Sequence, residues 1–216
     1  MEPYREVICN PIATEPPYGF AAVVERLHMP ESPARASPWL NVRITGGIYL
    51  AYFLTTVFAQ ILDGRGLVEY WIMGNVITNM FYVAVTVLLY DLFKPVDKNL
   101  SLLAAFFSLA GCAVATLGLF HVTPYDASPL IFFGPFCLLI GYLIIRSTFL
   151  PRTLGVLMVL AAIGWLVYLS PLATPLDSAI EVVGIVAEGS LMLWLLIMGM
   201  NVQRWSEQSE KANAAR

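Results

Sequence analysis

The chain has 216 residues, of which 58% are hydrophobic and only 12% are charged, with a formal net charge of −3. A soluble domain carries about 25% charged residues, so a water-soluble fold of this size would be unable to hide so much apolar surface. The absence of basic patches and of phosphate-binding glycine loops also excludes nucleic acid as an expected partner.

The first forty residues differ from the rest of the chain. They hold seven of the fourteen prolines and no apolar run longer than a few residues. An ordinary signal peptide needs an apolar core of about 7 to 15 residues, so none is expected here. We predict a disordered, Pro-rich cytoplasmic tail over 1–40, which is either an unstructured extension or a docking segment, and Met29 offers an alternative start.

Six apolar runs follow, each of roughly the twenty residues that a helix needs to cross about 30 Å of hydrocarbon. A segment within lipid must satisfy its own backbone hydrogen bonds, which predicts helices. The expected fold class is all-α, a polytopic integral membrane bundle of six transmembrane helices within 41–205, followed by a cytoplasmic tail over 206–216. The runs are 44–62, 70–90, 100–120, 127–145, 153–171 and 178–201.

The basic residues predict the orientation of these helices. Eleven of the twelve Lys and Arg residues fall in the two tails and in the second and fourth connections, whereas Arg65 alone lies on the opposite side. Basic connections remain in the cytoplasm, so both termini are expected there, N-in and C-in. The lipid bilayer is therefore the expected partner, and the predicted location is the bacterial inner membrane.

The third run carries small residues at every fourth position. Ala104, Ser108, Cys112 and Thr116 form a ridge of the kind that lets membrane helices approach closely. This pattern predicts that the third run is a central packing helix. Cys112 and Cys137 both lie inside predicted spans, so no extracellular disulfide framework is expected.

The residues Arg146-Ser147 are followed by Leu150-Pro151-Arg152 and Leu154-Gly155-Val156. This stretch is the most specific part of a resemblance to the DUF4386 family of bacterial multi-pass membrane proteins. The similarity covers about 43–205, and this chain departs from the family in its long tail and in a short first connection. The family has no established activity, so the resemblance implies a fold and a location but no catalytic residues. The other matching stretches are 89–96, 100–106, 133–134, 141–145, 187–188, 194–196, 199 and 201.

Arg146 and Arg152 flank the predicted cytoplasmic turn after the fourth run. Pro151 can stop a helix there, and long arginine side chains reach from a helix end to the membrane surface. We interpret the two arginines as cytoplasmic anchors. Contact with the head group of an anionic lipid is the alternative role.

Glu188 is the charged residue deep within the sixth run, whereas Glu181 lies near its outer end. It lies near the bilayer midplane, about 15 Å from the outer end by the helical rise. A carboxyl group at that depth is expected to face the interior, to be protonated or to have a partner. Asn79 in the second run lies at a similar depth, and the expected polar site opens to the outside, with Gln60 and His121 near its rim. The candidate intramembrane polar site comprises Glu188, Asn79, Asn75 and Glu181.

Two roles remain open for Glu188. In a non-enzymatic membrane protein, such as a small transporter or a sensor and scaffold, it responds to protons or cations in an outward-facing cavity. In a purely structural role it bonds to Asn79 and holds two helices together, which is worth about 0.6 to 2 kcal/mol. The alternative class is an enzyme acting on a lipid or another membrane substrate at the outer interface, with His121, Tyr125 and Asp126 as its candidates.

Specific cofactor chemistries find no support in the sequence. No lysine lies within an apolar run, which excludes a retinal Schiff base, and the two histidines, His28 and His121, provide no paired haem ligation within the bundle. Neither a His-Glu-x-x-His motif nor a Gly-x-Ser-x-Gly motif is present. We therefore predict no cofactor, no metal site and no assigned catalytic residue.

Overall fold

The computed structural model describes residues 38–120, 122, 128–167, 170 and 173–214. The predictions for residues 1–37, including the alternative start at Met29, lie outside the described residues. The same holds for His121, Tyr125 and Asp126. The first described helix begins at Pro38, so the last three residues of the predicted tail belong to a helix.

All regular elements in the described ranges are helical, which confirms the all-helical fold class. Each predicted run overlaps one of the helices α2 to α7, although the ends differ by several residues. The elements are α2 (Pro38–Asp63), α3 (Val68–Phe93), α4 (Lys98–Leu119), α5 (Leu130–Arg146), α6 (Arg152–Val167), α7 (Ala173–Leu193), the π-helical segment η1 (Trp194–Met198) and α8 (Val202–Ala214).

Four of these helices are long and apolar enough to cross a membrane. They are Trp39–Asp63, Val68–Phe93, Lys98–Leu119 and Ser178–Met198. The other two apolar helices, Leu130–Arg146 and Arg152–Val167, have 17 and 16 residues. At 1.5 Å per residue they reach only about 25 Å, somewhat less than the hydrocarbon core.

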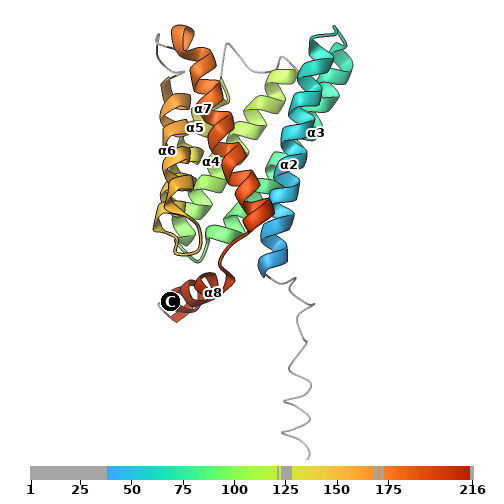
Figure 1. The fold of residues 1–216 in the computed structure, drawn as a ribbon. Coiled ribbons are helices and arrows are strands. Elements are labelled where there is room, and N and C mark those ends of the chain that lie inside the picture. Colours follow the sequence, from blue (N-terminus) through green and yellow to red (C-terminus); the bar gives the residue numbers. More distant parts are fainter. Residues whose placement is uncertain (1–37, 121, 123–127, 168–169, 171–172, 215–216) are drawn as a thin grey trace, which may run out of the picture. The chain divides into compact units, whose positions relative to one another are not determined.

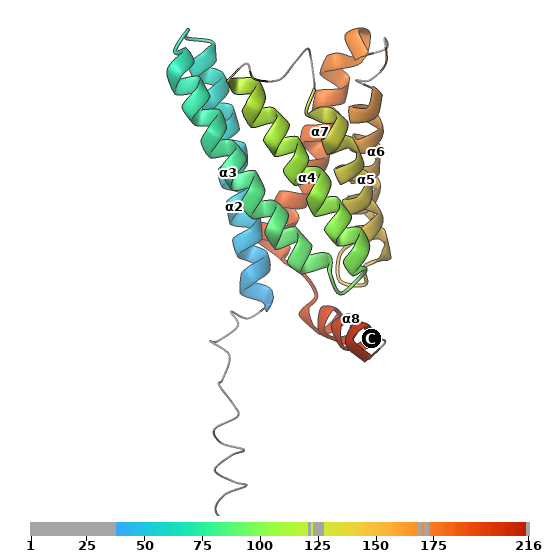
Figure 2. The same ribbon diagram turned by 180° about the vertical axis from the view of Figure 1, so that it is seen from behind.

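The helices pack in chain order, and the last one returns to the first. Each of α2 to α6 packs against its successor, while α7 and η1 also pack on α2 (Figures 1 and 2). One close approach is between α5 and α6, where a Cβ atom added to Gly141 would lie 2.8 Å from the carbonyl oxygen of Gly155. Glycine at both positions is what allows the two backbones to come so close.

The end of the sixth predicted run differs from a continuous helix. The amide of Gly199 donates to the carbonyl of Trp194, five residues earlier, and Gly199 has a φ of +70° that favours glycine. Arg43 lies over the Trp39 ring at 4.0 Å and donates to the carbonyl of Ile197. The start of α2 therefore holds the end of η1, and the chain leaves the bundle there.

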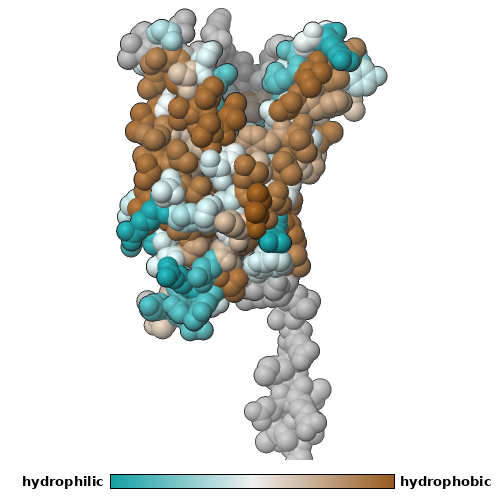
Figure 3. Space-filling view, viewed as in Figure 1, coloured by the Kyte–Doolittle hydropathy of each residue, from teal (hydrophilic) through white to brown (hydrophobic). Residues whose placement is uncertain are grey.

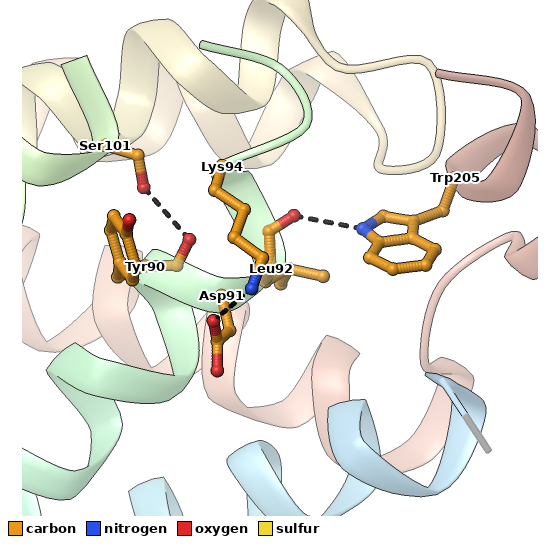
Figure 4. Close-up of polar contacts among 6 residues, drawn as sticks. All are labelled: Tyr90, Asp91, Leu92, Lys94, Ser101 and Trp205. Atoms are coloured by element: carbon orange, nitrogen blue, oxygen red, sulfur yellow. Dashed lines mark hydrogen bonds and ion pairs between the residues drawn. The ribbon is translucent and has the colours of Figure 1, made fainter. Parts of the chain in front are cut away.

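The helix α8 was not predicted from the sequence, which indicated a cytoplasmic tail over 206–216. Its Trp205 indole donates to the carbonyl of Leu92 at the end of α3, at 3.1 Å, as Figure 4 shows. The backbone and side chain of Thr148, between α5 and α6, both donate to Gln208 at 3.3 and 3.2 Å. These contacts hold α8 across one end of the bundle, so it is part of the packed structure.

The sides of the bundle are apolar. Figure 3 shows hydrophobic side chains over the flanks of α2, α6 and α7 and hydrophilic ones toward the two ends. Large side chains such as Phe58, Met80 and Phe106 are about three-fifths exposed or more. A soluble monomer rarely exposes apolar patches beyond a few hundred Å². This surface is suited to lipid, which agrees with the apolar composition.

Candidate functional site

Glu188 lies in the interior of the bundle, where α2, α5 and α7 meet. Its side chain is enclosed, with an exposed fraction of 8%, while Tyr49 and Cys137 are completely buried. The Tyr49 hydroxyl donates to Glu188 Oε2 at 2.8 Å, and the Cys137 thiol donates to Oε1 at 3.9 Å. One carboxyl group thus connects three helices that are far apart in the sequence.

The partners of Glu188 are hydroxyl and thiol groups rather than a cation. In the described part of the chain, the ion pairs are Lys94–Asp91 and Arg146–Asp97, both outside the bundle core. The buried Tyr82 ring packs edge-on against Tyr49 beside this carboxyl group. Among the described residues, an ionised Glu188 is therefore stabilised by hydrogen bonds and not by an ion pair.

Aromatic rings enclose the tyrosine end of the site. The Tyr49 ring lies 5.8 Å from Tyr52, 5.6 Å from Phe53 and 6.1 Å from Tyr82. Tyr82 in turn meets Phe133 edge-on at 5.3 Å. Tilted and edge-to-face ring pairs such as these fill the space around the site with apolar groups and keep the local dielectric constant low. Hydrogen bonds and charges at Glu188 consequently have larger effects than they would in water.

Helical periodicity explains why these side chains converge. Tyr49, Tyr52 and Phe53 are spaced by three and four residues, which places them along one side of α2. Glu188 shares its side of α7 with the buried residues Ala187 and Leu191. The buried face of α7 points to the bundle centre, and the carboxyl group is carried inward with it.

Asn79 does not bond to Glu188, in contrast to the structural role considered from the sequence. Its amide donates to the Thr116 hydroxyl of α4 at 3.1 Å, and Thr116 donates to the Cys112 carbonyl. The residue of α3 that joins the site is Tyr82, three positions further on and therefore turned by about 60° around the helix from Asn79. The small-residue ridge of the third run thus meets α3, and Asn79 lies in a groove of about 610 Å³ between α3 and α4.

The other predicted residues of the polar site have separate environments. Asn75 donates to the carbonyl of Trp71 within its own helix, at 2.9 Å. Glu181 and Gln60 are exposed. No hydrogen bond of the described structure joins any two of the four residues predicted for the polar site.

Tyr49 and Cys137 were not predicted from the sequence as residues of the site. Both are of residue types that are common in apolar helices, so neither was conspicuous. The only usable signal was the aromatic spacing in the first run, which marks one face of that helix but not the helix it contacts. The hydrogen bond itself joins residues 139 positions apart.

Arg146 and Arg152 lie at the end of the bundle that carries α8. The Arg146 guanidinium is 3.5 Å from the Tyr142 hydroxyl and 3.9 Å from Asp97 Oδ2. Asp97 also caps α4 by accepting from the amides of Asn99 and Leu100. Arg152 begins α6 and is exposed. Both arginines therefore flank the α5–α6 turn and keep exposed side chains.

Metal chemistry has no visible site in the described ranges. No group of three or more His, Cys, Asp and Glu residues lies there in an arrangement that would hold a metal ion. The two described cysteines, Cys112 and Cys137, are both buried and unbridged.

Comparisons with known proteins match most of this bundle. A family model described as "Domain of unknown function (DUF4386)" matches residues 44–125 and 125–199. A protein of Archaeoglobus fulgidus named "Uncharacterized protein" is 31% identical over 138 residues, which cover 60% of this chain and 84% of the relative. No solved structure matches the chain. The family match includes Tyr49, Cys137 and Glu188.

Proposed function

Because this chain belongs to the DUF4386 family, whose domain has no described function, we propose its role from its own geometry: an integral membrane protein in which Glu188 is a proton-responsive group. The family assignment and the apolar helices agree with an integral membrane protein. The arrangement at Glu188 favours a sensor or a small transporter over an enzyme. A proton bound at this carboxyl group changes how α2, α5 and α7 are held together.

We propose six spans with both termini in the cytoplasm. The charge distribution supports this topology, since among the described Lys and Arg residues only Arg65 lies at the end away from α8. The shorter helices α5 and α6 can still cross if the bilayer thins locally or if flanking side chains reach the surface. The basic residues at the α8 end are Arg43, Lys94, Lys98, Arg146, Arg152, Arg204 and Lys211.

The 2.8 Å hydrogen bond between Tyr49 and Glu188 is the observation that supports the proton response. An ionised carboxylate accepts hydrogen bonds at both oxygens, from Tyr49 and from Cys137. A protonated carboxyl group has a proton of its own to donate, and the Tyr49 oxygen is positioned to accept it. Protonation at Oε2 therefore reverses the bond that links α2 to α7, and protonation at Oε1 leaves a neutral bond, which is weaker than a bond to an ionised carboxylate.

A structural role makes a different prediction. If Glu188 only holds helices together, its protonation state stays constant and the packing of α2 against α7 is independent of pH. If Glu188 titrates, the packing changes over the pH range in which the carboxyl group exchanges its proton. The two roles therefore differ in a measurable property of the intact protein.

The test is hydrogen exchange of the full-length protein in lipid nanodiscs between about pH 5 and about pH 9, with rates corrected for intrinsic exchange. We expect exchange in α2 and α7 to depend on pH in the wild type and to lose that dependence in Glu188→Gln, which has no titrating group. Glu181→Gln is the matched control, because it removes an exposed carboxyl group from the same helix. A wild-type response that survives in Glu188→Gln would refute the proposal.

A further inference from the structure

The α5–α6 turn collects arginine side chains from three different segments. Arg146 ends α5 and Arg152 begins α6. Arg204 comes from α8, and its guanidinium donates to the carbonyl of Thr148 within the turn at 3.3 Å. The close contact of Gly141 with Gly155 brings α5 and α6 together, so the two helix ends that carry Arg146 and Arg152 are neighbours. We call these three residues the arginine cluster.

The cluster has more positive than negative charge. Its nearest carboxylate is Asp97, 3.9 Å from Arg146, and that side chain already accepts two amides at the start of α4. Among the residues that the structure describes, Arg152 and Arg204 form no ion pair, and neither does Glu207, the acidic residue that follows Arg204 on α8. Lys94, at the same end of the bundle, is instead neutralised by Asp91 at 2.6 Å.

Aromatic side chains place the cluster at the level of the lipid head groups. Tyr142 is 45% exposed on the apolar flank of α5, and the Arg146 guanidinium lies 5.7 Å from its ring centroid. Trp205 follows Arg204 directly and is half-buried against the end of α3. Tyr and Trp concentrate where hydrocarbon gives way to head groups, so arginines beside them face phosphate groups.

We propose that the arginine cluster binds the phosphate of an anionic lipid head group. Guanidinium groups present paired N–H donors whose spacing matches phosphate oxygens, which a lysine does not reproduce. A simple anchor needs only one charge at a helix end, whereas here α8 adds Arg204 to the turn through a fixed contact with Thr148. This inference rests on the membrane setting and is independent of any titration of Glu188.

The experiment uses the full-length protein in a neutral detergent. Native mass spectrometry follows the binding of phosphatidylglycerol, with phosphatidylcholine of the same acyl chains as the comparison. We expect preference for phosphatidylglycerol in the wild type and about fivefold weaker binding for each of Arg146→Gln, Arg152→Gln and Arg204→Gln. The matched control is Lys211→Gln, which removes a cation from α8 outside the cluster and should leave binding unchanged.

Three results would overturn the proposal. The first is equal binding of the two lipids by the wild type. The second is a loss of binding in Lys211→Gln as large as in the arginine variants, which would indicate diffuse attraction to net charge. The third is displacement of bound phosphatidylglycerol by inorganic phosphate, which would identify a soluble phosphate compound as the ligand. Retention of the lipid in the presence of phosphate supports a head-group site.

A second set of variants covers any loss of folding. Arg146→Lys, Arg152→Lys and Arg204→Lys keep the charge and the length of the side chain while removing the paired donors. We expect each to bind phosphatidylglycerol more weakly than the wild type but more tightly than the glutamine variant. Unchanged binding in all three lysine variants would contradict recognition by guanidinium groups.

Discussion

A double-mutant cycle between Tyr49 and Glu188 tests the centre of the structure directly. The perturbations are Tyr49→Phe, which removes only the hydroxyl, Glu188→Leu, which removes the acceptor, and the combination of both. The hydroxyl and the carboxyl oxygen are 2.8 Å apart and both side chains are buried, so each single change leaves a polar group without its partner. The double variant removes both partners, and its cost should be smaller than the sum of the single costs.

The magnitude depends on the charge of Glu188. A neutral hydrogen bond between membrane helices contributes about 0.6 kcal/mol on average and at most about 1.7 kcal/mol. A hydrogen bond to an ionised group is worth about 1.5 to 3 kcal/mol. We therefore expect the coupling energy to increase with pH as the ionised fraction of the carboxyl group grows, and a constant value would indicate a single protonation state.

Steric trapping of reversible unfolding in bicelles supplies the free energies of unfolding for the four proteins. The cycle is measured near pH 5 and again near pH 9. A coupling energy close to zero at both values would refute the role assigned to the Tyr49–Glu188 bond. A constant, nonzero coupling energy would retain the bond but refute the proton response.

Three further predictions concern packing, the α3–α4 groove and α8. Gly141→Ala should lower the free energy of unfolding by about 1 to 3 kcal/mol, because its Cβ would lie 2.8 Å from a backbone oxygen. Gly47→Ala is the control and should be neutral or stabilising, because nothing lies within 4 Å of its Cβ. A thermal unfolding series in which Gly47→Ala is the less stable variant would contradict the packing. Asn79→Val should reduce the free energy of unfolding by about 0.6 to 1.7 kcal/mol, because the hydrogen bond to Thr116 is lost. The pH dependence of hydrogen exchange in α7 should remain as in the wild type. Loss of that pH dependence would show that Asn79 belongs to the Glu188 site. Trp205→Phe should speed hydrogen exchange in α8 by about two- to tenfold, because a hydrogen bond worth about 0.5 to 1.5 kcal/mol is lost, and unchanged exchange would show that the indole bond does not hold the helix.

The elements were predictable because each depends on local composition. Long apolar stretches interrupted by short polar connections mark the helices α2 to α7 without any reference to their neighbours. Their ends were less predictable, as at Gly199, where a positive φ and a π-helical segment end the sixth apolar run before its last residues. The helix α8 was missed because its polar composition resembles that of an ordinary tail, and its contacts with Leu92 and Thr148 are tertiary.

The candidate site shows the same division. The sequence by itself determined that this is an apolar, all-helical, membrane-type protein, that its basic residues favour one side, and that Glu188 needs an enclosed position, because these properties follow from the residues of each segment. Only the tertiary structure decided that Tyr49 and Cys137 surround Glu188 while Asn79 bonds to Thr116. Asn79 and Tyr82 differ by only about 60° around the axis of α3, yet Asn79 faces α4 and Tyr82 faces the Glu188 site. The packing of all the neighbouring helices sets the rotation of α3, so no single segment encodes it.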